Sequence, residues 1–201
     1  MKLIVALGDS TTAGTPLFLS PLEAPPEGQG DERSQFAYWL MQQRPDWRVL
    51  NRGVNGERSD QIAARFDRDV LAERPDAVII IAGVNDVYQG RPAAQVTPVL
   101  HGLYERAARA TIPIVAGSIV PYNTATPAAN AVMREINRWI QDEAARRATL
   151  LFADTRAATA AADDPDRLAG SPDGLHPDVD GYRRMAEVLE PALNKFFEMA
   201  R

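Results

Sequence analysis

The sequence predicts an α/β protein, a three-layer sandwich in which helices cover both faces of a five-stranded parallel sheet. Short apolar runs, each closed by glycine or polar residues, recur along the 201 residues and are typical of strands buried on both faces. Amphipathic helical patterns separate these runs, as in parallel sheets whose strands are joined by crossover helices. No internal repeat and no linker divides the chain, so we expect one domain spanning residues 1–201.

The individual elements follow from the same patterns. The predicted strands are Leu3–Leu7, Trp47–Leu50, Ala77–Ala82, Ile112–Val120 and Leu150–Ala153. The predicted helices are Phe36–Met41, Ser59–Leu71, Ala93–Ala110, Thr126–Arg147 and a last helix that begins near Asp180. Ser59 is expected to cap its helix through its hydroxyl, and Thr126-Pro127 has the composition of a helix start.

The segment Thr11–Ser34 does not fit the alternation. It is rich in proline and glycine and shows little periodicity, which predicts a long loop without regular structure. Such a loop is either functional or a tolerated surface insertion. Its position directly after Ser10 favours a functional role, with Leu17 and Phe18 in one wall of an apolar pocket. Whether the loop closes over a substrate stays open.

Composition narrows the classes of function. The formal net charge is -5 and no run of Lys and Arg occurs, so we expect no nucleic-acid partner. The chain has no cysteine, which excludes thiolate metal sites and a cysteine nucleophile. No apolar stretch reaches the length of a transmembrane helix, and Met1–Leu7 is too short for a signal peptide. A cytoplasmic protein is the default expectation, although a mature exported chain would look the same; the oligomeric state stays open.

Polar side chains collect where the predicted strands end. Gly8-Asp9-Ser10 follows the first strand, Gly53 the second and Gly83-Val84-Asn85-Asp86 the third, and Asp173-Gly174-Leu175-His176 precedes the last helix. In a doubly wound sheet, ligands bind at the carboxyl ends of the strands. These segments are therefore expected to share one site.

The residue types in these segments are those of a serine hydrolase. A serine hydroxyl needs an imidazole to take its proton, and the imidazole needs an acceptor that fixes its tautomer. Of the two histidines, His101 lies beside the apolar stripe of a helix and is expected to be solvated. His176 lies in a loop before Pro177, three residues after Asp173. We therefore expect Ser10 as nucleophile, His176 as base and Asp173 as its partner.

The tetrahedral intermediate also needs hydrogen-bond donors for its oxyanion. The backbone N–H groups of Ser10 and Gly53 and the side-chain amide of Asn85 are the expected donors. Asp9 and Asp86 are expected to act only as turn and cap residues that hold Ser10 and Asn85.

Together these motifs resemble the SGNH or GDSL hydrolase superfamily, named for its serine, glycine, asparagine and histidine. The resemblance rests on Gly8-Asp9-Ser10, Gly53 within Asn51–Gly56, Asn85 within Gly83–Asp86 and His176 within Asp173–Tyr182. It implies a flavodoxin-like sheet, hydrolysis of esters or thioesters, no metal or organic cofactor, and the roles assigned above. Thr11 departs from the leucine that follows the nucleophile in the family motif, so no subfamily is assigned. The α/β-hydrolase fold is excluded because no Gly-x-Ser-x-Gly elbow occurs.

The leading hypothesis is an acyl hydrolase of the esterase, thioesterase or lysophospholipase kind that acts on a small acyl ester. The expected acyl pocket, chosen by position along the chain, consists of Leu17, Phe18, Val84, Tyr88, Tyr122 and Leu175. The apolar loop residues favour aliphatic or aryl esters. A carbohydrate O-acetylesterase with the same triad and a non-catalytic binding protein are the alternatives. A nucleotide-binding protein is set aside because no phosphate-binding glycine motif stands at a strand–helix junction.

Overall fold

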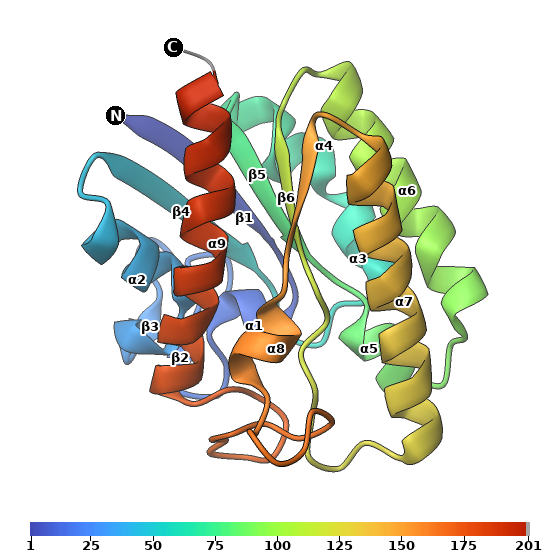
Figure 1. The fold of residues 1–201 in the computed structure, drawn as a ribbon. Helices are drawn as coiled ribbons and strands as arrows, with labels where there is room; N and C mark the ends of the chain where they lie inside the picture. The colour runs from blue at the N-terminus through green and yellow to red at the C-terminus, as the bar shows by residue number, and fades with distance from the viewer. Residues whose placement is uncertain (200–201) are drawn as a thin grey trace.

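Five parallel strands form the central sheet in a computed structural model that describes residues 1–199 (Figure 1). The strands are β1 (Lys2–Gly8), β4 (Trp47–Gly53), β5 (Ala77–Ile81), β6 (Ile114–Gly117) and β7 (Leu150–Ala153). Their order is β4-β1-β5-β6-β7, and every neighbouring pair is parallel. Gly8 pairs in register with Gly53 on one side and with Ile81 on the other. The carboxyl ends of β4, β1 and β5 therefore meet at one edge.

Helices cover both faces of the sheet and complete the predicted three layers (Figure 1). The longer helices are α2 (Phe36–Gln43), α3 (Ser59–Ala64), α6 (Ala93–Arg109), α7 (Pro127–Arg146) and α9 (Val179–Met199). The short ones are α1 (Ser10–Ala13), α4 (Phe66–Asp69), α5 (Val84–Tyr88) and α8 (Thr155–Thr159). Of these helices, α2 and α9 pack on one face, whereas α3, α4, α6 and α7 pack on the other.

Two apolar cores follow from the alternation of side chains along the strands. In β1, Val5 and Leu7 belong to the core under α6 and α7, whereas Ile4 and Ala6 belong to the core under α2 and α9. All four side chains are fully buried. A strand with apolar residues on both faces needs cover on both faces, which is why the continuous apolar runs predicted a sandwich.

The predicted helix over 59–71 is interrupted. The structure ends α3 at Ala64, places Arg65 at the junction, and continues with α4 and a 3₁₀ turn, η2 (Leu71–Glu73). The predicted cap is wrong as well, because Arg58 occupies the N-cap position and Ser59 is the first helical residue. The hydroxyl of Ser59 donates to Asp86 of α5 instead. A tertiary contact has replaced the local one.

The segment 11–34 is ordered, which corrects the expectation of a structureless loop. It contains α1, the two-stranded antiparallel pair β2 (Phe18–Leu19) and β3 (Gln29–Gly30), and a 3₁₀ turn, η1 (Glu32–Ser34). Phe18 is buried inside this hairpin. Ser20 Oγ donates to the carbonyl of Gly53 at 2.6 Å, and Tyr182 Oη donates to the carbonyl of Thr15 at 3.0 Å. The segment is therefore tied to β4 and α9.

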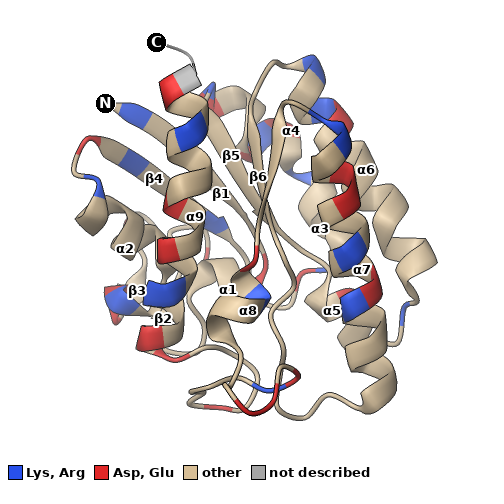
Figure 2. Cartoon of the chain, viewed as in Figure 1, with Lys and Arg blue, Asp and Glu red and all other residues tan. Residues whose placement is uncertain are grey.

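Charged side chains of both signs are interspersed along α7 and α9 in the view of Figure 2. No helix in residues 1–199 is long and apolar enough to span a membrane. The absence of a nucleic-acid partner and the assignment of residues 1–201 to one domain stay predictions.

Candidate active site

Ser10 lies at the carboxyl end of β1, where the chain turns into α1. Asp9 is the N-cap residue of α1, and its Oδ1 accepts the N–H of Thr11 at 2.9 Å. The N–H groups of Thr12 and Ala13 both bond to the carbonyl of Asp9. Within residues 1–199, the N–H of Ser10 has no acceptor, as expected for the first turn of a helix. Ser10 thus presents a free backbone donor beside its own hydroxyl.

His176 and Asp173 form a close pair in the loop before α9. Asp173 Oδ2 lies 2.7 Å from His176 Nδ1. Asp173 Oδ1 accepts the backbone N–H groups of Leu175 and His176, both at 2.9 Å. This carboxylate therefore fixes both the loop and the ring, and leaves Nε2 as the nitrogen that is free to act on a substrate.

The pKa of Asp173 lies below its ordinary value. Partial burial raises the pKa, but the hydrogen bonds from His176 and from the N–H groups of Leu175 and His176 outweigh it. Asp173 is consequently ionised at neutral pH, which is the state that holds a proton on His176 Nδ1.

One cavity of about 160 Å³ is shared by Ser10 and His176. Its lining consists of Ser10, Thr11, Asn55, Val84, Asn85, Tyr88, Tyr122, Leu175 and His176. The structure thus brings together the predicted nucleophile, base and amide donor, and with them four of the predicted pocket residues. Within residues 1–199, no hydrogen bond joins Ser10 Oγ to the His176 ring; such bonds are often long in unliganded enzymes.

Leu17 and Phe18 do not line this cavity, which corrects their assignment to the acyl pocket. Phe18 is buried in the β2–β3 hairpin, where a Cβ on Gly28 would lie 2.4 Å from its ring. Leu17 is exposed beside it, and its carbonyl accepts the N–H of Asp31. Because the segment 11–34 buries Phe18 within its own hairpin, these apolar residues no longer favour aliphatic or aryl esters.

Gly53 also has a different role from the predicted one. Its N–H, expected to face the oxyanion, donates to Asn51 Oδ1 at 2.9 Å. A Cβ at Gly53 would lie 2.1 Å from the backbone nitrogen of Ala13. A glycine is therefore required here because α1 packs directly on β4, and the N–H of Gly53 is not available to a substrate.

The next glycine, Gly56, carries a backbone N–H that the sequence analysis did not consider as a donor. The N–H groups of Val54, Asn55 and Glu57 bond to Gly8 O, Glu23 Oε1 and Val54 O, respectively. Within residues 1–199, the N–H of Gly56 has no acceptor. Gly56 has φ +77° in the turn beside Asn55, which lines the cavity. The Asn55-Gly56 dipeptide, a strong turn signal, was the available clue.

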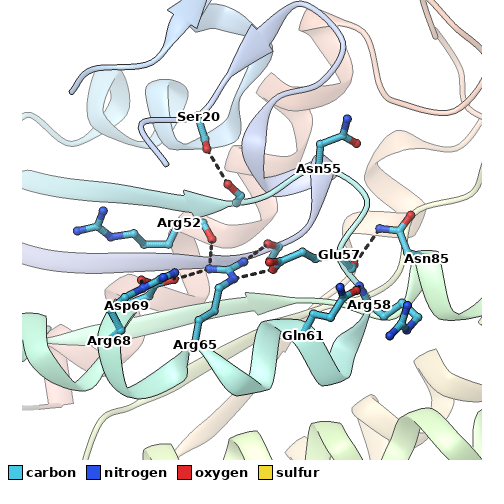
Figure 3. Close-up of polar contacts among 12 residues, drawn as sticks. Ser20, Arg52, Asn55, Glu57, Arg58, Gln61, Arg65, Arg68, Asp69 and Asn85 are labelled. Carbon is cyan, nitrogen blue, oxygen red and sulfur yellow. Dashed lines mark hydrogen bonds and ion pairs between the residues drawn. The ribbon is translucent and has the colours of Figure 1, made fainter. Parts of the chain in front are cut away.

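Asn85 lies in the first turn of α5 and is half-buried. Its Nδ2 donates to the carbonyl of Glu57 at 2.9 Å (Figure 3). An amide nitrogen carries two N–H donors, so this bond leaves the second one for a ligand in the cavity. The same bond ties Asn85 to the turn that contains Gly56.

The two aspartates beside Ser10 and Asn85 are fully buried. Asp86 accepts the N–H of Ser59 at 2.7 Å and its hydroxyl at 3.0 Å, so it binds the start of α3. Burial raises the pKa of Asp9 from 3.8 to about 7, and the charge of Asp86 adds to the rise, although the hydrogen bonds from Thr11 oppose it. Asp9 is a cap residue, as expected. Asp86 is not the cap of α5, whose N-cap residue is Gly83; it binds Ser59 and Arg91 instead.

The remaining histidine lies away from this site. His101 is half-exposed on α6, with Nδ1 3.5 Å from Glu143 Oε2 and 3.2 Å from an Arg147 nitrogen. Within residues 1–199, no group of three or more His, Asp and Glu side chains has the arrangement of a metal site.

Comparison with known proteins identifies the family of this chain. The profile of the GDSL-like lipase/acylhydrolase family matches residues 6–184. The chain belongs to this family. The protein is therefore a carboxylic-ester hydrolase of the GDSL family, and the superfamily expected from the motifs is confirmed.

Proteins similar in sequence or in structure agree with the family and the fold. An acetylxylan esterase from Geobacillus stearothermophilus is 30% identical over 155 residues, which cover 71% of this chain and 70% of the relative. The structure of a protein assigned to the G-D-S-L lipolytic family from Desulfitobacterium hafniense has a TM-score of 0.77 at 24% identity, and covers 95% of this chain and 99% of that one. The acetylxylan esterase Axe2 has a TM-score of 0.74 at 22% identity, and covers 96% and 94%. The three-layer fold expected for this GDSL hydrolase is thereby confirmed.

Proposed function

We propose that this GDSL hydrolase cleaves short acyl esters through an acyl-enzyme on Ser10. The observation that carries the proposal is the 2.7 Å pair of Asp173 and His176, because His176 lines the same cavity as Ser10. An imidazole oriented by a carboxylate and facing a serine is the arrangement that activates a hydroxyl as nucleophile.

In this mechanism, Ser10 Oγ attacks the ester carbonyl while His176 Nε2 takes the hydroxyl proton. The ionised Asp173 stabilises the resulting imidazolium through Nδ1–H. His176 then gives the proton to the departing alcohol oxygen, which leaves an acyl-enzyme. A water molecule, deprotonated by His176, then attacks the acyl carbon. The bond from the acyl carbon to Ser10 Oγ breaks, His176 returns the proton to Oγ, and the acid leaves.

The oxyanion of each tetrahedral intermediate would accept hydrogen bonds from three groups: Ser10 N–H, Gly56 N–H and Asn85 Nδ2. The two backbone groups lack acceptors within residues 1–199, and the amide retains one free N–H. Preorganised donors of this kind contribute a large part of the stabilisation in acyl transfer.

The size of the cavity favours a short acyl group. A volume of about 160 Å³ is close to that of a cavity that holds benzene, on the order of 150 Å³, so a short acyl group would fill it. An acetyl group fits such a space.

An O-acetylated carbohydrate is the substrate class that a second cavity favours. This cavity, about 620 Å³, shares Tyr88 and Tyr122 with the first and is also lined by Arg91, Thr124 and Thr126. The two tyrosine rings lie 5.7 Å apart, and Tyr88 is 61% exposed. The lining also includes Val87, Pro92 and Val132, so polar and apolar groups are mixed in this larger space. A hydroxylated leaving group would occupy it, in keeping with the acetylxylan esterase relative.

A panel of esters tests the proposal. We expect kcat/KM for p-nitrophenyl esters to fall steeply from acetate to octanoate, and acetylated xylo-oligosaccharides to release acetate. Ser10→Ala and His176→Ala should abolish both activities, and a fluorophosphonate should label wild-type protein at Ser10 but not Ser10→Ala. Absence of labelling in folded wild-type protein would favour a non-catalytic binding protein, and a preference for octanoate would overturn the short-acyl assignment.

A further inference from the structure

Arg65 is a buried cation whose guanidinium contacts the ends of β1 and β4, beside the proposed active site. Its side chain is 7% exposed, and it stands where the helix predicted over 59–71 breaks between α3 and α4. A buried guanidinium needs an acceptor for nearly every N–H, so its partners show what it holds.

Four acceptors surround this guanidinium (Figure 3). Nη2 donates to the carbonyl of Gly8 at 2.7 Å, and Nη1 donates to the carbonyl of Arg52 at 2.7 Å. Nε donates to Glu57 Oε2 at 2.6 Å, and Nη1 also donates to Asp69 Oδ2 at 2.7 Å. One side chain therefore binds the end of β1, the end of β4 and the turn after β4.

Two of these segments, the end of β1 and the turn after β4, lead to the three proposed oxyanion donors. Gly8 stands two residues before Ser10, and Glu57 directly follows Gly56. The carbonyl of Glu57 in turn accepts Asn85 Nδ2 at 2.9 Å. The guanidinium thus links the nucleophile turn, the Gly56 turn and, through Glu57, the amide of Asn85.

We propose that Arg65 is a positioning residue that sets the spacing of the three oxyanion donors by fixing these segments around one planar group. The inference rests on the function proposed for Ser10. Arg65 itself does not line the cavity, so its effect passes through the residues that it holds. The fork of an arginine is required because a lysine ammonium cannot direct bonds to four separated acceptors.

Asp69 binds two arginines, Arg65 and Arg68. Comparing these arginines separates the proposed positioning role of Arg65 from simple pairing with a buried carboxylate. Arg68 also binds Asp69, with distances of 2.6 and 3.0 Å, yet its side chain is 68% exposed. Within residues 1–199, it makes no hydrogen bond to a strand end. Arg68 therefore offers a matched control that shares the carboxylate with Arg65 but lacks the contacts to Gly8 and Arg52.

The test compares Arg65→Lys with Arg68→Lys, using p-nitrophenyl acetate. For Arg65→Lys we expect kcat to fall about 10- to 100-fold while KM changes less than about 3-fold, because donors that fit only the tetrahedral intermediate are displaced. Arg68→Lys should keep kcat within about 2-fold of wild type. Cooperative unfolding and an unchanged far-UV circular dichroism spectrum establish that both variants are folded.

A double-mutant cycle with Asn85→Ala gives a readout that general destabilisation would not move. If Arg65 acts through the oxyanion donors, adding Arg65→Lys to Asn85→Ala should slow kcat far less than it slows the wild-type enzyme. Independent, multiplying effects, or a kcat of Arg65→Lys within 2-fold of wild type, would overturn the inference.

Should Arg65→Lys not fold, Glu57→Gln provides the second variant, since it weakens the Nε contact but keeps the backbone carbonyl that binds Asn85. We expect its kcat to fall about 3- to 10-fold at constant KM, and an unchanged kcat would refute the role. Wild-type protein without esterase activity or fluorophosphonate labelling would instead refute the proposed function, so the two failures are distinct.

Discussion

Gly53 and Gly56 lie three residues apart and need glycine for different reasons. At Gly53 the space for a side chain is taken by the backbone of Ala13, and the N–H is bonded to Asn51. At Gly56 a Cβ would meet no atom within 4 Å, and φ is +77°. Steric packing explains the first glycine, and a left-handed turn with a free N–H explains the second.

Alanine substitutions should separate these two reasons. Gly53→Ala should lower the free energy of unfolding by about 3 kcal/mol or more, because the clash is with backbone that cannot move aside. Gly56→Ala should cost only about 1–2 kcal/mol for the left-handed conformation, yet lower kcat on p-nitrophenyl acetate about 10-fold as the turn shifts its N–H. Urea unfolding and steady-state kinetics measure both. Equal stability of the two variants would contradict this assignment.

Asp173→Asn tests the orientation of His176. The asparagine Oδ1 would still accept the N–H groups of Leu175 and His176, so the loop should keep its conformation. Its Nδ2 would then donate to His176 Nδ1 and force the ring proton onto Nε2, where it blocks proton transfer from Ser10. We expect kcat to fall on the order of 10⁴-fold with little change in the free energy of unfolding. A kcat near that of wild type would remove Asp173 from the triad.

At the scale of elements, α1 begins at Ser10, the proposed nucleophile, and the Asp9 cap before it buries a carboxyl group. Asp9 caps α1 through Oδ1, whereas its Oδ2 has no hydrogen-bond partner within residues 1–199. Burial without full hydrogen bonding is the main cause of its pKa of about 7. The cap that starts α1 therefore carries an electrostatic cost at high pH.

Asp9→Asn should reveal this cost as a change in the pH dependence of stability. Because the folded pKa of about 7 exceeds the ordinary value of 3.8, the folded state binds the proton more tightly between these pH values. Wild type should therefore lose stability from this group as pH rises from 4 to 8, by on the order of 4 kcal/mol. Asparagine keeps the Thr11 contact without titrating.

Urea unfolding of both proteins at pH 5 and pH 8 measures this difference. The free energy of unfolding of Asp9→Asn relative to wild type should be higher at pH 8 than at pH 5. The same relative stability at both pH values would show that Asp9 does not titrate in this window.

At the scale of the whole molecule, the sheet edge carries two adjoining cavities of unequal size. The smaller one is lined by Ser10 and His176, and the larger one extends past Tyr88 and Tyr122 toward the start of α7. A substrate with a small acyl group and a larger alcohol would match this division.

Tyr88→Ala tests whether the acyl group and the alcohol of the substrate occupy separate cavities, because Tyr88 lines both of them. Loss of an aromatic contact worth about 0.5–1.5 kcal/mol should raise KM for an acetylated xylo-oligosaccharide about 3- to 10-fold. The kcat/KM for p-nitrophenyl acetate, whose leaving group is small, should change less than about 3-fold. Equal losses on both substrates would place Tyr88 at the acyl side instead.

Local patterns in the sequence were sufficient for the strands, for α2, α6, α7 and α9, and for the Asp173–His176 segment. Apolar runs at 3–7 and 77–82 can be buried only between two layers, so their burial follows from the residues alone. Asp173 and His176 are three residues apart, and their contact is likewise local.

Tertiary contacts decided the rest, because they join residues that no local pattern relates. Gly53 is restricted by Ala13, forty residues away, and Arg65 binds Gly8 across the sheet edge. Phe18 was expected in the pocket but is buried in its own hairpin. The sequence by itself determined which residue types could carry out ester hydrolysis. Only the folded chain decided that Gly56 is the glycine with the free N–H, since that depended on which donors distant acceptors had already taken.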